Sequence, residues 1–175
     1  SVYASKNRPK INPLICHVGA PEEAFELGVF NAHGRRLAER FWPGPLTLVV
    51  PRSADCPVSE LASAGLPTLA LRCPDHSVAR ALLGETARPL VAPSANPSGP
   101  LSPSQAHHVS AHWPDIDVLD GGACTVGLES TIIGCLEENP TLLRVGGLSR
   151  DALEACLDKG LAELPENADR TARLA

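Results

Sequence analysis

The chain has 175 residues, of which 43% are hydrophobic, and a formal net charge of −5, which predicts one folded domain with its own core. The acidic balance argues against a general nucleic-acid-binding protein, because such proteins normally carry a basic excess. No apolar run approaches the roughly 18 residues of a membrane-spanning helix and no secretory leader opens the sequence, so we expect a cytoplasmic protein with no membrane contact.

Short apolar runs bounded by proline, glycine or polar residues predict buried strands. In chain order these runs cover residues 14–18, 46–50, 68–73, 89–92, 131–135 and 141–145. Helix signals lie between and after them: one helix begins at Pro21, and the others cover residues 32–41, 75–83, 103–112 and 150–157, with Ser102 and Ser149 as N-caps of the last two. The helix over 75–83 is expected to close at Gly84.

The alternation of strands and helices predicts an α/β domain with a twisted, largely buried sheet. We place this domain at residues 1–162 and interpret residues 163–175 as a polar tail or linker.

The most informative segment is Pro-Leu-Val-Ala-Pro-Ser-Ala-Asn-Pro-Ser-Gly at residues 89–99. An apolar run ends there in small hydroxyl and amide side chains, so a buried strand would deliver Ser94, Asn96 and Ser98 to a site. A plain turn rich in serine and proline explains the segment equally well on its own.

The basic residues Lys6, Arg8, Arg72 and Arg144 each adjoin a strand-like run or a motif. A fold could gather them into one cationic cavity for an anion, although each alone reads as a solvated surface charge. The sequence lacks a P-loop and a Gly-x-Gly-x-x-Gly turn, so a bound phosphate would be held by side chains.

Suitable phosphate-binding groups are present among the same residues. The guanidinium groups of Arg8 and Arg144 match phosphate geometry, Lys6 adds a point charge, and the hydroxyls of Ser94 and Ser102 can donate further hydrogen bonds.

Other site classes find less support. A serine hydrolase is disfavoured, because no Gly-x-Ser-x-Gly elbow is present and no histidine is marked as the base. His108 and His112 are four residues apart, but no glutamate follows His108 as zinc proteases require, and the six cysteines form no Cys-x-x-Cys pair, so we predict no metal site in the protein. Trp42 is expected to pack a helix end and not to stack on bases.

Four sequence blocks occur in one order: Lys-Asn-Arg-Pro at 6–9 with Asn-Pro-Leu at 12–14, Phe-Trp-Pro-Gly-Pro-Leu-Thr at 41–47, Ser-Ala-Asn at 94–96 and Gly-Leu-Glu-Ser-Thr at 127–131. With these blocks the chain resembles the Sua5/YrdC family of threonylcarbamoyl-AMP synthases from about residue 3 to residue 147. The resemblance implies a YrdC-like twisted mixed sheet flanked by helices, with a concave cationic cavity.

The resemblance also implies a nucleotidyltransferase activity. L-threonine, bicarbonate and ATP, with Mg²⁺, would give L-threonylcarbamoyladenylate and pyrophosphate for the threonylcarbamoyl modification of adenosine 37 of tRNA. Downstream threonylcarbamoyl-transferase proteins, and tRNA itself, would be partners.

The family's functional residues transfer onto matching positions of this sequence. Lys6 and Arg8 would be catalytic. ATP would contact Arg8, Asn12, Thr68, Ser94, Ser102 and Arg144. L-threonine would contact His17, Arg72 and Ser130.

The chain departs from the family pattern in two places. Ala92 stands where some members have threonine, and the family's N-terminal strand and helix, with a Pro-Thr-Glu-Thr-like motif, are missing from this sequence. Two alternative functions stay open: a carbamoyl-adenylating domain of the hydrogenase-maturation type, and a non-catalytic RNA-binding or ribosome-assembly module.

Overall fold

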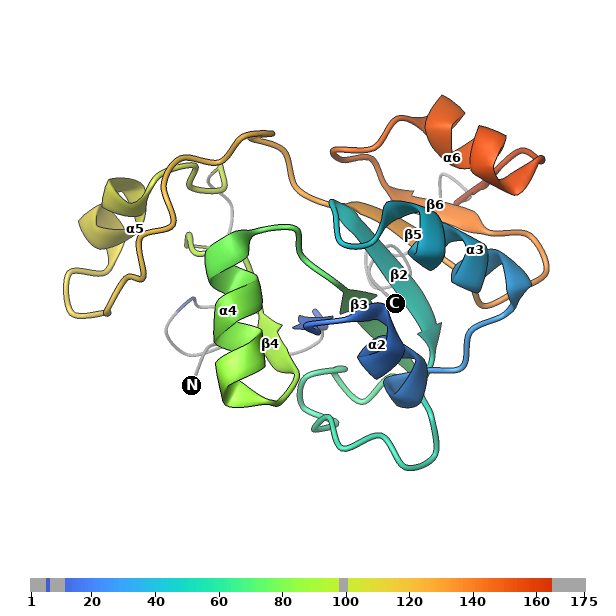
Figure 1. Ribbon diagram of the computed structural model, residues 1–175, viewed down its shortest axis with the longest axis horizontal. Helices are drawn as coiled ribbons and strands as arrows, with labels where there is room; N and C mark the ends of the chain where they lie inside the picture. The colour runs from blue at the N-terminus through green and yellow to red at the C-terminus, as the bar shows by residue number, and fades with distance from the viewer. Residues whose placement is uncertain (1–5, 7–11, 98–100, 165–175) are drawn as a thin grey trace.

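A computed structural model describes residues 6, 12–97 and 101–164 of the chain. They form a seven-stranded sheet in the order β4-β1-β3-β2-β5-β6-β7 (Figure 1). The strands are β1 (Ile15–His17), β2 (Leu46–Pro51), β3 (Thr68–Arg72), β4 (Leu90–Ala92), β5 (Thr131–Gly134), β6 (Thr141–Arg144) and β7 (Ala162–Glu163). The helices are α2 (Pro21–Leu27), α3 (Ala32–Phe41), α4 (Ser77–Thr86), α5 (Ala106–His112) and α6 (Arg150–Leu157).

The sheet is mixed, and the predicted α/β class with a mixed sheet is confirmed. β1 pairs with β3, β2 with β5 and β6 with β7 in parallel, whereas β1 and β4, β2 and β3, and β5 and β6 are antiparallel. A strand forms at every run for which the sequence predicted one, and β7 is an additional edge strand.

The sheet has two different faces, because successive side chains of a strand point to opposite sides. On one face, residues such as Cys16 of β1 and Leu48 of β2 join Leu37 of α3 and Leu153 of α6 in the main hydrophobic core. On the other face lies only a small cluster of Val49, Ala70 and Ile132, with Ile15 and Leu143 packed against it. This second face is therefore available for a site.

The connection from α3 to β2 is built around a buried tryptophan. Trp42 is only 7% exposed, its Nε1 donates to the carbonyl of Leu46 at 2.8 Å, and its ring packs edge-on against Phe30. The Trp42–Pro43 peptide bond is cis. Trp42 packs the helix end against the sheet, as the sequence indicated.

Two helix ends differ from the sequence-based prediction. The helix predicted to start at Pro103 starts at Ala106, and Gln105, not Ser102, occupies its N-cap position. The reason is that the Ser102 hydroxyl donates instead to Glu129 Oε1 at 2.9 Å, which holds this segment against a distant loop. Helix α4 continues past Gly84 to Thr86 and closes at Ala87, which adopts the left-handed conformation with φ of 47°.

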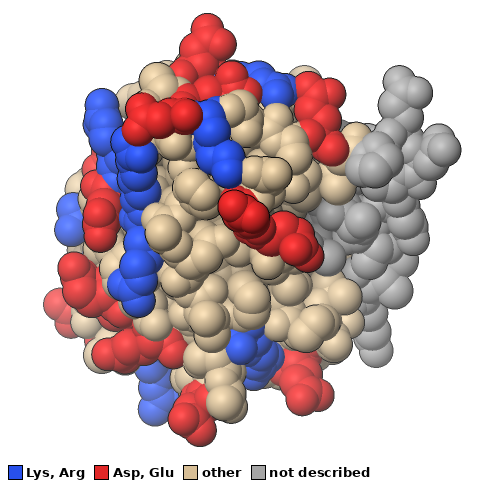
Figure 2. All heavy atoms as spheres, turned by 90° about the vertical axis from the view of Figure 1, so that its right-hand side faces the viewer, with Lys and Arg blue, Asp and Glu red and all other residues tan. Residues whose placement is uncertain are grey.

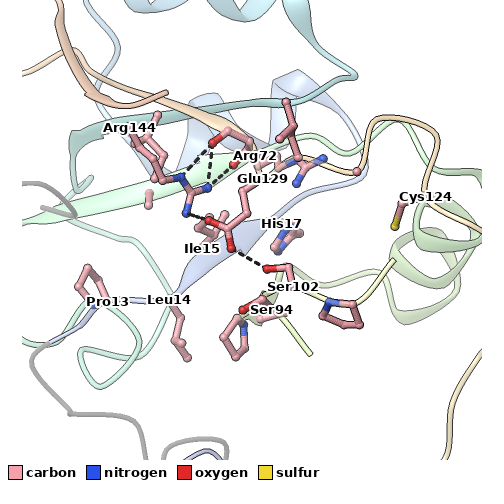
Figure 3. A pocket seen from close by; sticks show the side chains of 18 of the residues that line it. Pro13, Leu14, Ile15, His17, Arg72, Ser94, Ser102, Cys124, Glu129 and Arg144 are labelled. Atoms are coloured by element: carbon pink, nitrogen blue, oxygen red, sulfur yellow. Dashed lines mark hydrogen bonds and ion pairs between the residues drawn. The ribbon is translucent and has the colours of Figure 1, made fainter. Parts of the chain in front are cut away.

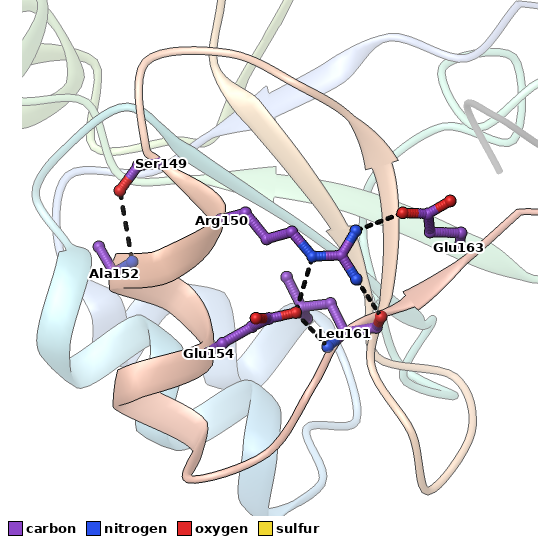
Figure 4. Close-up of polar contacts among 6 residues, drawn as sticks. All are labelled: Ser149, Arg150, Ala152, Glu154, Leu161 and Glu163. Atoms are coloured by element: carbon purple, nitrogen blue, oxygen red, sulfur yellow. Dashed lines mark hydrogen bonds and ion pairs between the residues drawn. The ribbon is translucent and has the colours of Figure 1, made fainter.

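The C-terminal part of the described chain is tied to α6 by Arg150 and Glu154. The Ser149 hydroxyl caps α6 as predicted. Arg150 donates to Glu154 Oε1 at 2.7 Å, to the carbonyl of Leu161 at 2.7 Å and to Glu163 (Figure 4). These bonds fix the short strand β7 beside β6, and the domain boundary predicted between residues 162 and 163 falls inside β7.

Candidate functional site

A cavity of about 290 Å³ lies on the sheet face opposite the main core (Figure 3). Its floor comes from β1, β3, β5 and β6, and its walls come from the loop after β4, the segment before α5 and the loop that precedes β5. Segments far apart in the sequence therefore meet around one space.

His17 and Arg72 form the centre of the cavity floor. They are paired across the parallel strands β1 and β3. Because their neighbours Cys16 and Leu71 are buried in the main core, strand alternation directs His17 and Arg72 to the cavity. Arg72 Nε donates to the carbonyl of Gly44 at 3.2 Å, and among the described residues no carboxylate forms an ion pair with Arg72.

Arg144 of β6 organises the opposite side of the cavity. Its Nε and Nη2 donate to the carbonyl of Ser130 at 3.1 and 2.8 Å, and Nη2 also donates to the Ser130 hydroxyl at 3.0 Å. Nη1 forms an ion pair with Glu129 Oε2 at 2.7 Å. The buried Ser130 hydroxyl shares a further hydrogen bond of 2.7 Å with Thr47 Oγ1 of β2.

The two arginines make the cavity attractive to anions. Burial lowers the pKa of Arg72, and the nearby charge of Arg144 lowers it further. Burial also lowers the pKa of Arg144, while Glu129 partly offsets this effect. Guanidinium groups remain charged at neutral pH in spite of such shifts. Two partly desolvated cations thus face one space, and an incoming anion would relieve their repulsion.

His17 is neutral at physiological pH. Burial, followed by the charge of Arg72, lowers its pKa from 6.5 to about 4. Contacts with the backbone of Leu90 and Ile15 oppose this lowering, but Nδ1 is buried without a hydrogen-bond partner of normal geometry. A neutral imidazole with an unused nitrogen can accept a hydrogen bond from a ligand or donate one to it.

Lys6 contacts Ser94, a residue that lines the cavity. It is 7% exposed, and its Nζ donates to the backbone carbonyl of Ser94. This contact joins the first sequence block to the Ser-Ala-Asn block.

Comparison with known proteins identifies the family. The family model Sua5/YciO/YrdC, described as telomere recombination, matches residues 1–146. The chain belongs to this family. Members of the Sua5/YciO/YrdC family with closely similar sequences include the threonylcarbamoyl-AMP synthase of Bacillus subtilis (strain 168), which is 42% identical over 176 residues that cover 94% of this chain and 50% of that protein.

An archaeal relative supports the same assignment in sequence and in structure. The threonylcarbamoyl-AMP synthase of Pyrococcus abyssi is 43% identical over 156 residues, covering 87% of this chain and 45% of that protein. A crystal structure of P. abyssi Sua5 complexed with L-threonine has a TM-score of 0.91 and 39% identity, covering 98% of this chain and 52% of that chain. The chain thus spans about half the length of the relatives it matches.

Most of the residues predicted from the sequence meet at the cavity. The lining includes His17, Arg72, Ser94, Ser102, Ser130 and Arg144. Asn12 immediately precedes the lining residue Pro13. Thr68 is half-buried at the start of β3, opposite Pro51, and does not belong to the described lining. Arg8 lies outside the described residues. The ligand assigned to each residue stays a prediction.

Sequence reasoning missed two members of the network, Thr47 and Glu129. Both stand inside blocks that carried the family resemblance, at residues 41–47 and 127–131. A buried threonine in an otherwise apolar strand, and a glutamate next to a predicted site serine, were signals that could have identified them.

The described part of the chain holds no cluster of three or more histidine, cysteine, aspartate or glutamate side chains that could bind a metal ion. None of the described helices has the length and apolar character needed to span a membrane.

Proposed function

We propose that this chain carries the catalytic domain of a threonylcarbamoyl-AMP synthase. The reaction forms L-threonylcarbamoyladenylate and pyrophosphate from L-threonine, bicarbonate and ATP, a nucleotidyl transfer. The observation that carries the proposal is the meeting of Arg72, Arg144 and neutral His17 on one sheet face, in a chain whose relatives are named threonylcarbamoyl-AMP synthases.

The amino-acid subsite is assigned to the cavity floor. Arg72 binds the threonine carboxylate, because its guanidinium group has no acidic partner among the described residues. His17 accepts a hydrogen bond from the threonine ammonium or hydroxyl group, and Ser130 contacts the same substrate. A P. abyssi relative has been crystallised with L-threonine, which agrees with an amino-acid site in this fold.

The nucleotide subsite is assigned to the loops around the floor. Lys6 and Arg144, with Arg8, neutralise the phosphates, and the hydroxyls of Ser94 and Ser102 donate hydrogen bonds to them. Asn12 and Thr68 complete the assigned ATP contacts. Mg²⁺ enters as part of the substrate MgATP, since the described residues offer no acidic cluster of their own and Mg²⁺ is commonly held by substrate phosphates.

The chemistry needs no protein nucleophile. The unprotonated threonine amine combines with bicarbonate, releasing water, or with carbon dioxide, releasing a proton, to form a carbamate. A carbamate oxygen then attacks the α-phosphorus of ATP while the bond to pyrophosphate breaks. The protein holds two anions in contact and neutralises the charge that develops on the phosphates. A recessed cavity also limits hydrolysis of the reactive product by water.

The product would serve the threonylcarbamoyl modification of adenosine 37 of tRNA through threonylcarbamoyl-transferase partner proteins, in the cytoplasm. The hydrogenase-maturation alternative is not favoured, because the similar relatives are named for threonylcarbamoyl-AMP synthesis. An RNA-binding module gains no support from the face in Figure 2, where acidic and basic side chains are intermingled.

The test is pyrophosphate release from MgATP, with L-threonine and bicarbonate present together or omitted singly, and with the nucleotide product identified by mass. We expect threonylcarbamoyl-AMP only when both are present. Arg72→Gln should raise the threonine KM at least tenfold and change the ATP KM little, whereas Arg80→Gln, on the exposed side of α4, is the matched control. ATP hydrolysis that ignores threonine, or equal effects of both variants, would contradict the proposal.

A further inference from the structure

Glu129 stands out in the cavity because it is the only acidic side chain among the described lining residues. Its Oε1 accepts a hydrogen bond from the Ser102 hydroxyl at 2.9 Å, and its Oε2 pairs with Arg144 Nη1 at 2.7 Å (Figure 3). Ser102 and Arg144 are both assigned to the ATP phosphates in the proposed function. A carboxylate therefore holds the groups that a phosphate would need.

We propose that Glu129 is an internal counter-anion, which occupies the phosphate-binding groups of Ser102 and Arg144 in the empty cavity and is displaced when ATP binds. This inference rests on the proposed function, because it assumes that the nucleotide phosphates bind at these two side chains. It adds a residue that sets the affinity for ATP through competition for those groups.

The geometry of Arg144 leaves one place for an incoming phosphate. Nε and Nη2 both donate to Ser130, whose carbonyl and hydroxyl oxygens hold the guanidinium group in place. Nη1 is directed to Glu129. Nη1 is thus the guanidinium nitrogen that Ser130 leaves to a ligand, so an incoming phosphate meets the carboxylate there, and the carboxylate and phosphate make the same charge-assisted contact with a guanidinium group.

The exposure of the two partners indicates which one moves. The Glu129 side chain is 45% exposed and that of Arg144 is 28% exposed. The backbone of Glu129 is fixed, because its carbonyl accepts from the Gly147 amide at 3.0 Å. Rotation of the Glu129 side chain into water thus releases Ser102 and Arg144 without moving the backbone. The ion pair that is lost is weak, because solvent screens it.

If ATP displaces Glu129, removing the Glu129 charge changes the ATP affinity in the opposite direction to removing a residue that only supports the site. If Glu129 competes with the phosphate, removing its charge strengthens ATP binding. If it only orients Arg144, removing its charge weakens ATP binding. Threonine affinity should change little in the first case, because among the described residues no hydrogen bond or ion pair joins Glu129 to Arg72 or His17, and Ser130 keeps its own bond to Arg144.

The experiment is calorimetric titration of the whole chain with a non-hydrolysable ATP analogue, with Mg²⁺ and with EDTA, and separately with L-threonine. Glu129→Gln keeps the shape of the side chain and should lower the Kd for the analogue about three- to tenfold under both conditions. Glu138→Gln makes the same charge change in the exposed turn between β5 and β6, and should alter the Kd less than twofold.

A second variant covers the case in which Glu129→Gln fails to fold, which a thermal unfolding scan will reveal. Glu129→Asp keeps the charge but shortens the reach, so it cannot hold Ser102 and Arg144 together; its Kd should lie between those of the wild type and the glutamine variant. Unchanged or weaker analogue binding by either variant overturns the inference, and so does weakening confined to Mg²⁺, since Glu129 would then hold the metal. If the wild type binds no analogue at all, the proposed function fails with it, whereas binding by the wild type that the variants leave unchanged refutes this inference alone.

Discussion

The hydrogen bond between Thr47 and Ser130 offers a sharp test of how the core supports the cavity. Thr47 is completely buried on β2, and its hydroxyl lies 2.7 Å from the Ser130 hydroxyl. Thr47→Val keeps the side-chain shape and removes the bond. Because Ser130 retains its contact with Arg144 Nη2 at 3.0 Å, only part of its polarity is left unsatisfied. We expect the free energy of unfolding to fall by about 1 to 2 kcal/mol.

The loss should appear in substrate binding as well as in stability. A freer Ser130 hydroxyl is expected to raise the threonine KM several-fold, with little effect on the ATP KM. Urea unfolding of wild type, Thr47→Val, Ser130→Ala and the double variant gives the coupling energy of the pair, which we expect to be about 1 kcal/mol. Strictly additive effects, or a threonine KM that does not change, would refute the reasoning that Thr47 positions Ser130.

Two further predictions concern the floor of the cavity and its edge. Burial lowers the pKa of His17 from 6.5 to about 4 in the folded chain, so the unfolded chain takes up a proton on this histidine at a higher pH than the folded chain. The contribution of neutral His17 to the free energy of unfolding is therefore present above pH 6.5 and is lost as the pH falls towards 4. This loss amounts to roughly 3 kcal/mol at most. Urea unfolding at pH 7 and pH 4 should therefore show a smaller drop in the free energy of unfolding for His17→Gln than for the wild type. Equal drops would contradict the assigned burial of His17. A Cβ on Gly146 would lie 2.3 Å from the carbonyl oxygen of Glu129 and 2.5 Å from the carbonyl carbon of Ser130; Gly146→Ala should therefore destabilise the fold by about 1 to 3 kcal/mol and reduce turnover. Gly84→Ala, in the last turn of α4, where a Cβ would meet no atom within 4 Å apart from the helix's own backbone, is the control and should stabilise by about 0.4 to 1 kcal/mol. A lower melting temperature for Gly84→Ala, or an unchanged one for Gly146→Ala, would contradict the packing argument.

Strands and class were predictable because their signals are local. Each apolar run between proline, glycine and polar residues became a strand, and the half-buried histidine at the end of β1 followed from its place in such a run. The edge strand β7 was not predictable, because Ala162 and Glu163 have no strand pattern. Tertiary contacts place them beside β6: Arg150 bonds Glu163 and the carbonyl of Leu161, and Leu161 is buried in the main core.

The start of α5 shows why a helix cap could be misplaced. Ser102 before Pro103 is a good local start signal, but the Ser102 hydroxyl bonds Glu129, which is distant in sequence. A tertiary hydrogen bond overrode the local preference. The family resemblance suggested Ser102 as a site residue, whereas the sequence did not reveal Glu129, because the role of Glu129 depends on which groups the fold brings to it.

The residues assigned to threonine and those assigned to the phosphates lie on different parts of the fold. Threonine is assigned to His17, Arg72 and Ser130, which lie on or beside the strands β1, β3 and β5; the carbonyl of Gly44 holds Arg72, and the buried hydroxyl of Thr47 holds Ser130. The phosphates are assigned in part to Ser94 and Ser102, which lie on loops. Strand-borne groups are positioned by the whole sheet, while loop groups can adjust to a ligand. We therefore expect strict discrimination among amino acids and looser discrimination among nucleotides. A turnover series with serine against threonine, and GTP against ATP, checks this, and the reverse order of selectivity would contradict the division.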